Sequence, residues 1–293
     1  RDSPTTRTAD CSNLEDAGAR WRIQRARSNS TGDGDGDISS DMHWTGRSAR
    51  AGLRSLANFV WPQRSILTGE RHHGDGVLTP EDFAHITFLN GAGCRACGTP
   101  LEVDYGPESL CGACAAKAPK WDQARAAIAY DDVSRQAILE LKHAGRRDGL
   151  SAMSNWMAMA GRDILPDTDW LVPVPLHYQR LASRGFNQAA WLAQGVARKT
   201  GTLALVDALS RKRNTQTQGG LTARQRQRNV AGAFEVRNSR LGRIKGSTVT
   251  LVDDVLTTGS TLAACTKALK KAGAARVNVL VLARVVREAD LTI

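Results

Sequence analysis

The sequence lacks the long apolar segments that place a protein in a membrane. It contains no run of 18 apolar residues, and no charged segment followed by an apolar one opens the chain. A transmembrane helix needs about 20 apolar residues, and a secretory signal needs that charged-then-apolar order. We therefore expect no membrane span and a cytoplasmic protein.

Acidic residues are outnumbered by basic ones. The chain has 40 Lys and Arg against 29 Asp and Glu, which gives a formal net charge of +11. This surplus favours polyanionic partners such as nucleic acid or nucleotide phosphates. It does not by itself indicate a fold.

The first part of the chain has little to bury. Residues 1–52 are mostly polar and include the low-complexity run from Gly32 to Asp37, which predicts a disordered tail. Alternating aspartates in that run resemble the start of a calcium loop. However, Ile38 stands where the loop needs glycine, and Trp44 stands where it needs glutamate. A solvated linker is the better interpretation.

A length of 293 residues accommodates two folded modules. We place a small cysteine-containing module at residues 53–120 and a larger domain at 121–293. In the larger domain, patterns typical of helices and strands alternate, which predicts an α/β fold with a parallel sheet covered by helices. The expected helices are 133–141, 150–160, 187–201 and 262–272, and the expected strands are 169–174, 249–252 and 277–283.

The strongest chemical signal follows the strand at 249–252. Asp253 and Asp254 come first, followed by Val255, Leu256, Thr257, Thr258, Gly259, Ser260 and Thr261, which open a helix. Small residues at a helix N-terminus direct backbone N–H groups at one point, and with the hydroxyls they form a phosphate-binding turn. The carboxylates suit the vicinal hydroxyls of a ribose. The alternative is an ordinary strand end that leads into a turn.

This segment resembles the fingerprint of type I phosphoribosyltransferases. Three further blocks, Leu171 to Leu176, Arg184 to Ala189 and Arg228 to Phe234, resemble those of the ComF competence-protein family. The resemblance covers roughly residues 55 to 290. It implies a type I phosphoribosyltransferase-like sheet with flanking helices, preceded by a small zinc ribbon.

The resemblance also implies a ligand. Phosphoribosyl pyrophosphate would bind at Asp253, Asp254 and the turn up to Thr261, and Mg²⁺ would travel with the ligand because it keeps waters and needs few protein ligands. The implied role lies in DNA uptake or utilisation, with a competence helicase as a possible partner. The alternative is an active salvage enzyme that transfers ribose 5-phosphate to a nucleobase, and no segment declares how a base would be positioned.

Two regions are candidates for the pyrophosphate side of the ligand. Pro173, Val174 and Pro175 resemble the pyrophosphate loop of the family, although an ordinary strand end explains them equally well. Between Asp207 and Glu235 the sequence has no acidic residue and many basic ones, which predicts a mobile basic loop. Its cations and their upstream neighbours are Arg180, Arg184, Arg211, Lys212, Arg213, Arg224, Arg226 and Arg228.

Three interpretations of this basic segment remain open. It closes over pyrophosphate, it contacts the backbone of single-stranded DNA, or it is a solvated loop.

Four of the six cysteines form two C-x-x-C pairs, Cys94 with Cys97 and Cys111 with Cys114. In a reducing compartment this pattern indicates metal more often than disulfides. The pairs resemble the zinc ribbon of the family, and four thiolates can surround Zn²⁺ tetrahedrally without an open catalytic position. Relatives often carry a further pair upstream, where this chain reads Gln63 to Gly69. We therefore expect one structural zinc.

Overall fold

The computed structural model describes residues 63–72, 77–89, 91, 93–101, 103, 106–143, 147–212 and 223–286. These belong to one compact unit, Ala57–Ile293. The tail expected at residues 1–52 lies outside the described residues, and the domain boundaries that we placed at 52/53 and 120/121 stay predictions.

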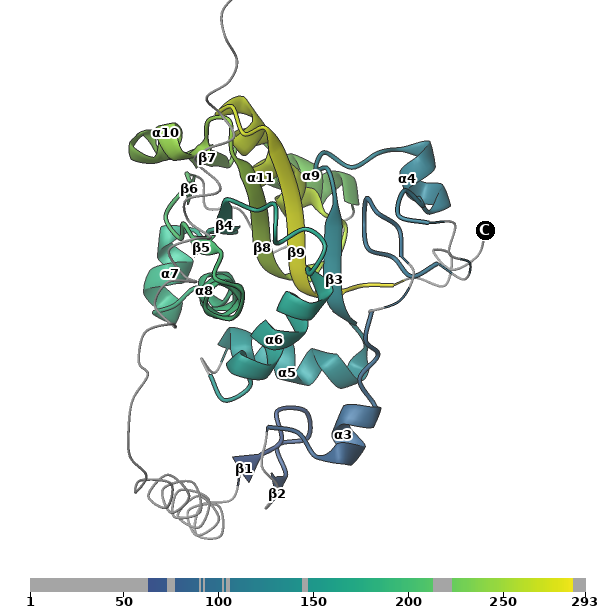
Figure 1. Ribbon diagram of the computed structural model, residues 1–293. Helices are drawn as coiled ribbons and strands as arrows, with labels where there is room; N and C mark the ends of the chain where they lie inside the picture. Colours follow the sequence, from purple (N-terminus) through teal and green to yellow (C-terminus); the bar gives the residue numbers. More distant parts are fainter. Residues whose placement is uncertain are drawn as a thin grey trace, which may run out of the picture. The chain divides into compact units, whose positions relative to one another are not determined.

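A five-stranded sheet forms the centre of this unit (Figure 1), and all its neighbouring strands run parallel. This confirms the expected parallel α/β fold. In spatial order the strands are β3 (Ala124–Ala129), β9 (Arg276–Arg284), β8 (Thr248–Leu256), β4 (Trp170–Pro173) and β5 (Leu203–Ala204).

Helices cover both faces of the sheet. The face that carries α5, α6 and α8 packs one hydrophobic cluster, and the face that carries α9 and α11 packs another. The helices are α3 (Pro80–Ala84), α4 (Gly112–Ala116), α5 (Asp132–His143), α6 (Leu150–Ala160), α7 (Tyr178–Arg184), α8 (Gln188–Thr200), α9 (Ala223–Val230), α10 (Leu241–Ile244) and α11 (Ser260–Lys271). Two small antiparallel pairs and a 3₁₀ helix complete the described elements: β1 (Gln63–Arg64) with β2 (Arg71–His72), β6 (Leu209–Arg211) with β7 (Phe234–Val236), and η1 (Asn238–Arg240).

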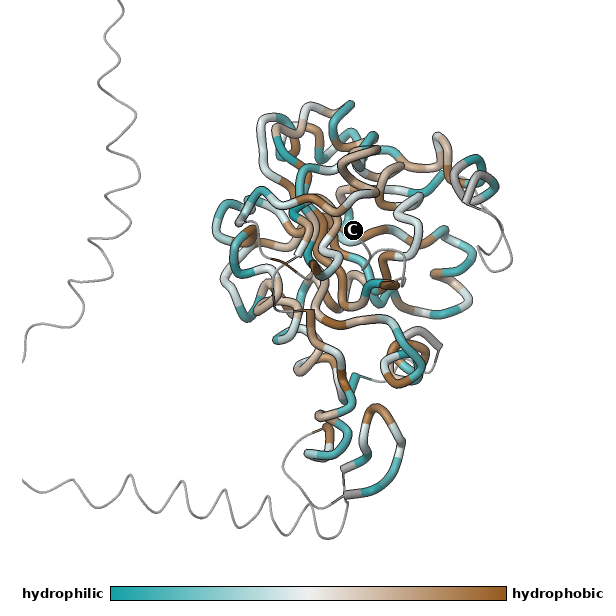
Figure 2. Tube along the Cα trace, turned by 90° about the vertical axis from the view of Figure 1, so that its right-hand side faces the viewer, coloured by the Kyte–Doolittle hydropathy of each residue, from teal (hydrophilic) through white to brown (hydrophobic). Residues whose placement is uncertain are grey.

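Because side chains alternate along a strand, each central strand contributes residues to the hydrophobic clusters on both faces of the sheet. In β9, Val279 and Val281 face the cluster of α11, whereas Leu280 and Leu282 face that of α6 and α8. Figure 2 shows the resulting concentration of hydrophobic residues in the central strands. A sheet buried on both faces reads as a nearly continuous apolar run, which is how β9 reads.

Helix α8 shows how local sequence fixes the boundaries of an element. Asn187 is its N-cap, and its Oδ1 accepts a hydrogen bond of 3.1 Å from the Ala189 N–H. Gly201 ends the helix in the left-handed region at φ 77°. Both assignments confirm the sequence expectation. No helix in the described part of the chain is long and apolar enough to cross a bilayer.

Candidate functional site

The two adjacent carboxylates lie inside β8 rather than after it. The sequence placed the strand end at Val252, but pairing with β9 continues through Leu256, opposite Arg284. Val255 and Leu256 are therefore strand residues, and the turn begins at Thr257. The strand is longer than expected because a parallel neighbour of nine residues pairs along its whole length.

Because successive strand side chains alternate, Asp253 and Asp254 point to opposite faces of the sheet. Asp254 is buried on the α8 side, where its Oδ2 accepts a hydrogen bond of 2.9 Å from Nε2 of the buried Gln188. Asp253 is half-buried on the α11 side, near Arg211 and Cys265. The strand thus presents one carboxylate to each face at its carboxyl end.

Arg211 of β6 adds positive charge beside Asp253. Burial and the nearby Arg180 lower the pKa of the Arg211 guanidinium, whereas Asp253 opposes this shift by attraction. The guanidinium also lies over the Phe234 ring, 5.3 Å from its centroid. A partly desolvated cation of this kind is suited to a phosphate oxygen.

The turn after β8 has the form of an anion-binding helix start. Gly259 is the N-cap of α11 with φ 71°, and as a glycine it offers no side chain to cap the first turn of this helix. The hydroxyls of Thr258 and Ser260 lie 3.1 Å apart, and Thr257 is exposed. Backbone N–H groups and hydroxyls therefore gather at the positive end of α11.

The end of β4 borders this turn. Pro173 pairs with Val252, and the Val174 N–H donates to the Val252 carbonyl at 2.9 Å. Pro173 and Val174 are buried, and Pro175 is half-buried. The chain continues from β4 to β5 on one side and from β8 to β9 on the other. The gap between β4 and β8 is thus the switch point where open α/β sheets bind ligands.

Helix α7 follows β4 and carries half-buried Arg180 and Arg184. The buried His177 is its N-cap and accepts from the Gln179 N–H at 3.4 Å. Burial, with Arg211 and Arg180 nearby, lowers the pKa of this imidazole. Arg180 is therefore close to Arg211, although 31 positions separate them in the sequence.

The basic segment differs from the expected mobile loop. Arg211 lies in β6, and residues 223–230 form α9, so Arg224 and Arg228 belong to a helix. Residues 223–230 contain no Gly or Pro, and α9 packs on α11 with Val230 buried, which explains the helix. Arg228 is exposed, whereas the Arg224 side chain and residues 213–222 lie outside the description.

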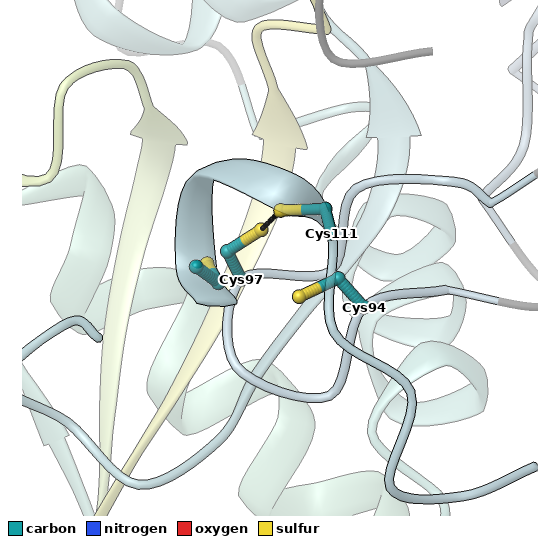
Figure 3. A group of neighbouring side chains, drawn as sticks. Cys94, Cys97 and Cys111 are labelled. Atoms are coloured by element: carbon teal, nitrogen blue, oxygen red, sulfur yellow. Dashed lines mark hydrogen bonds between the residues drawn. The ribbon is translucent and has the colours of Figure 1, made fainter. Parts of the chain in front are cut away.

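The four paired cysteines come together. Their Sγ atoms lie within 4.8 Å of one another, and those of Cys97 and Cys111 are 3.7 Å apart (Figure 3). All four are buried and free, and within the described residues no disulfide joins them. Four thiolates around zinc at a Zn–S distance of about 2.3 Å would have sulfurs about 3.8 Å apart. The cluster is therefore the right size and chemistry for a soft metal ion.

Without a metal, the pKa values of the Cys97 and Cys114 thiols are raised and that of Cys94 is lowered. Burial raises the pKa of Cys114 to about 12, and the hydrogen bond to Cys94 together with burial raises the pKa of Cys97. By accepting the bond from Cys97, Cys94 has its pKa lowered to about 4. A bound cation would stabilise all four as thiolates.

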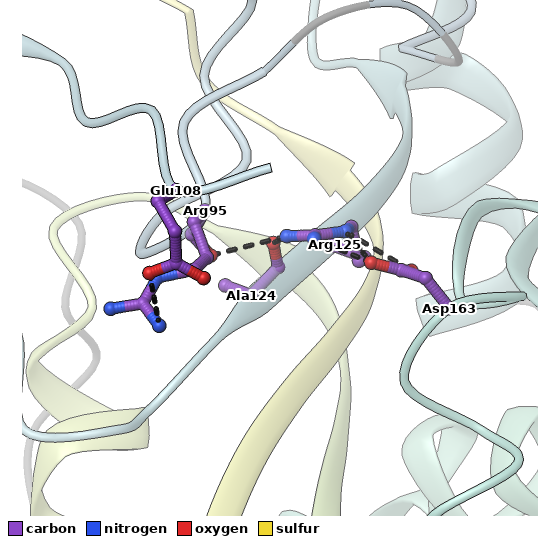
Figure 4. A network of polar contacts seen from close by, with 5 residues as sticks. All are labelled: Arg95, Glu108, Ala124, Arg125 and Asp163. Atoms are coloured by element: carbon purple, nitrogen blue, oxygen red, sulfur yellow. Dashed lines mark hydrogen bonds and ion pairs between the residues drawn. The ribbon is translucent and has the colours of Figure 1, made fainter. Parts of the chain in front are cut away.

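The cysteine module is attached to the edge of the sheet by polar contacts (Figure 4). Nη1 of Arg125 in β3 donates to the Arg95 carbonyl at 3.1 Å, and its Nε donates to both Asp163 carboxylate oxygens at 3.2 and 3.0 Å. The Arg95 side chain forms an ion pair of 2.9 Å with Glu108. Arg125 thus joins the first C-x-x-C turn to β3, and it joins β3 to the segment just after α6.

Comparison with known proteins identifies the family. The phosphoribosyl transferase domain matches residues 181–290. DNA utilization protein YhgH of Salmonella typhi is 35% identical over 196 residues, 65% of this chain and 83% of that protein. Competence protein F of Haemophilus influenzae is 33% identical over 198 residues, 65% of this chain and 84% of that protein. The chain belongs to the ComF family. Competence protein ComFC of Bacillus subtilis is a more distant relative, 26% identical over 195 residues, 64% of this chain and 75% of that protein.

Membership of the ComF family, together with the parallel sheet, confirms the expected type I phosphoribosyltransferase-like domain. Three residues around the candidate site were not chosen as site residues from the sequence: Gln188, His177 and Trp121, whose indole lies against Gly259. The sequence offered a signal for Gln188, because it directly follows the N-cap of α8. It offered none for His177 and Trp121, since only tertiary packing brings them to the site.

Proposed function

We propose that this ComF-family protein binds phosphoribosyl pyrophosphate at the switch point between β4 and β8, and that it serves in DNA uptake or utilisation. The observation that supports this ligand is that acidic and hydroxyl groups lie together at the carboxyl edge of the sheet. Asp253 and Asp254 lie near the carboxyl end of β8, and the turn from Thr257 to Thr261 follows that strand.

Each part of the ligand has a chemically matched group. The 5′-phosphate suits the N–H groups and hydroxyls of the turn, whereas ribose hydroxyls suit carboxylate oxygens, which accept without donating. The pyrophosphate suits Arg180 and Arg211, with the segment Pro173 to Pro175 at its border. Arg184, Arg224 and Arg228 complete the set that we assign to the pyrophosphate side.

The donor set also fits Mg²⁺. A half-buried carboxylate such as that of Asp253 is the kind of single protein ligand that Mg²⁺ takes while it keeps waters and phosphate oxygens. Bound there, the ion would neutralise pyrophosphate charge.

The cysteine cluster is the second part of the proposal. We assign it one structural Zn²⁺, held by Cys94, Cys97, Cys111 and Cys114. Four thiolate ligands fill the tetrahedral shell and leave no position for substrate, so the ion would stabilise the module.

The test of the ligand is calorimetry with phosphoribosyl pyrophosphate and Mg²⁺. The double variant Asp253→Asn with Asp254→Asn should lose binding, since two charge-assisted hydrogen bonds of about 1.5–3 kcal/mol each are at stake. A matched control is Asp131→Asn with Asp132→Asn, an adjacent pair at the start of α5. Wild-type affinity in the Asp253/Asp254 variant would overturn the assignment.

The role in DNA utilisation rests on the relatives named for it and on the net charge of +11. Incubation with phosphoribosyl pyrophosphate, Mg²⁺ and each nucleobase, followed by a pyrophosphate assay, separates this role from base salvage. Release of pyrophosphate with one base would favour a salvage enzyme. Binding without release would favour a ligand-binding protein of DNA metabolism.

A further inference from the structure

Trp121 connects the cysteine module to the β8–α11 turn. It lies at the start of the sheet domain, three residues before β3, and its side chain is buried. Its indole Nε1–H donates a hydrogen bond of 2.6 Å to the carbonyl of Ala96. Ala96 lies between Cys94 and Cys97, so this bond anchors the indole to the first C-x-x-C turn.

The other end of the indole rests on Gly259. A methyl group built on Gly259 would lie 3.2 Å from Cζ3 of Trp121, which is tight, and 2.5 Å from Cη2, which is closer than a real contact allows. Glycine is therefore required here for two reasons, since the φ of 71° also disfavours any side chain. Gly259 is the N-cap of α11, so the indole fixes the position where the helix and its N–H groups begin.

A second contact joins the same two regions. Nη1 of Arg284 donates to the Cys97 carbonyl at 2.7 Å, and Arg284 is buried at the carboxyl end of β9. Arg284 pairs with Leu256, the last residue of β8 before the turn. Two consecutive carbonyls of the cysteine turn, those of Ala96 and Cys97, thus accept from side chains that border the β8–α11 turn.

We propose that Trp121 is a positioning residue: it holds Gly259, and with it the turn from Thr257 to Thr261, in the ligand-binding conformation, and the metal at the four cysteines holds Trp121. A metal fixes the direction of the Ala96 carbonyl, which sets the indole, and the indole sets the turn. The ligand and metal parts rest on the proposed function. Because linkage is reciprocal, ligand binding would raise metal affinity by the factor by which metal raises ligand affinity.

Hydrogen exchange of the full-length protein tests the positioning without any ligand. Removal of zinc by a chelator should speed amide exchange in the peptide that covers residues 257–262 at least tenfold in the wild type. Trp121→Phe lacks both the Nε1–H and the outer ring, so the same peptide should exchange fast with or without zinc. The matched control is Trp156→Phe, on the opposite face of the sheet, and it should keep the response to zinc. Equal exchange of this peptide in all states would overturn the proposal.

Calorimetry with phosphoribosyl pyrophosphate and Mg²⁺ supplies a second readout. Gly259→Ala should weaken binding at least tenfold, because the methyl group collides with the indole. Trp121→Phe should weaken binding as well, but it removes the colliding ring atoms, so the double variant should lose less affinity than the sum of the two single losses. Additive losses would contradict the contact.

The two proposals fail separately in these experiments. A wild type that does not bind phosphoribosyl pyrophosphate contradicts the proposed ligand, while the exchange measurement still decides the role of Trp121. Normal ligand binding with a zinc-independent turn contradicts the positioning role alone.

Discussion

A single residue, Gln188, separates the roles of the two neighbouring carboxylates. Its amide holds Asp254 on the α8 face, whereas Asp253 is left on the opposite face near Arg211. Gln188 is only 4% exposed, so its hydrogen bond is made where water cannot replace it. One carboxylate is therefore fixed by the protein, and the other is more accessible to a ligand.

We expect Gln188→Met, which keeps the shape but removes the amide donor, to lower the free energy of unfolding by about 1–3 kcal/mol, because a buried hydrogen bond to a carboxylate is lost. Urea denaturation measures the change. Gln136→Met is the control, since Gln136 is exposed on α5 and its bond to Glu140 is exposed too. An equal and small effect in both variants would contradict the buried clamp.

His177 should make stability depend on pH. Its folded-state pKa is lowered by burial, Arg211 and Arg180, so the unfolded chain takes up a proton at a higher pH than the folded chain. The stabilisation linked to His177 is fully present above its unfolded-state pKa of about 6.5, and it is lost as the pH falls towards the folded-state pKa. The variant His177→Asn keeps a hydrogen-bond acceptor at the N-cap but has no side chain that titrates in this pH range.

Urea midpoints of the wild type and His177→Asn at pH 7.5 and 5.5 measure this contribution. The wild type should lose more stability than the variant between these two values. The same loss in both proteins would show that other groups dominate.

Among the helices and strands, those with a clear local pattern, such as helix caps or an apolar run, could be predicted from the sequence. Helix α8 has a capping Asn187 and a terminating Gly201, and β9 is a nearly continuous apolar run, so both were predicted correctly. Strand β3 was missed because its alanine-rich sequence has weak strand propensity, and pairing with β9 decides its conformation. Helix α9 was taken for loop because its sequence is polar and ends in a single apolar residue, Val230, which the structure buries.

The site was predictable only as far as local sequence determines it. The Asp253–Asp254 pair and the glycine turn could be chosen from the residues alone. Their division between two faces depends on β8 extending past Val252, which is set by the partner strand. The approach of Trp121 to Gly259 joins segments that are 138 positions apart, and no local pattern encodes it.

The cysteine module should carry one equivalent of zinc per chain, because four buried sulfurs form a cluster of tetrahedral size. Elemental analysis of the purified protein measures it. Cys111→Ser should lower the content well below one, whereas Cys265→Ser, in the core of α11, should not. A content of two equivalents would reveal a further ligand set, and a content near zero would contradict the metal site.

For the whole molecule, charge determines the expected association with DNA. The surplus of 11 positive charges includes the basic segment between Asp207 and Glu235, whose described cations Arg211, Lys212 and Arg228 lie on β6, the residue after it, and α9. Arg211 is near Asp253 of the ligand site, so the basic surface begins where phosphate is expected to bind. A non-specific contact with a nucleic-acid backbone is a sum of such charges rather than a property of one.

We expect weak binding to single-stranded DNA without sequence preference, through residues 211–228 together with Arg180 and Arg184. Neutralised phosphates release counterions, so a log–log plot of affinity against salt should fall with a slope of about −0.7 per phosphate contacted. Replacing Arg224, Arg226 and Arg228 by Gln should flatten that slope by about two units if each contacts a phosphate. Fluorescence anisotropy over a salt series measures it.

The matched control removes the same charge elsewhere, by replacing three exposed arginines on the opposite face of the sheet with Gln. They are Arg135 in α5, Arg162 just after α6 and Arg198 in α8. This variant has the same net charge as the α9 variant, so a general loss of attraction would affect both equally. A flatter slope only in the α9 variant would assign DNA contact to that helix. Unchanged DNA affinity with weaker phosphoribosyl pyrophosphate binding would instead assign α9 to the ligand and refute its role in DNA contact.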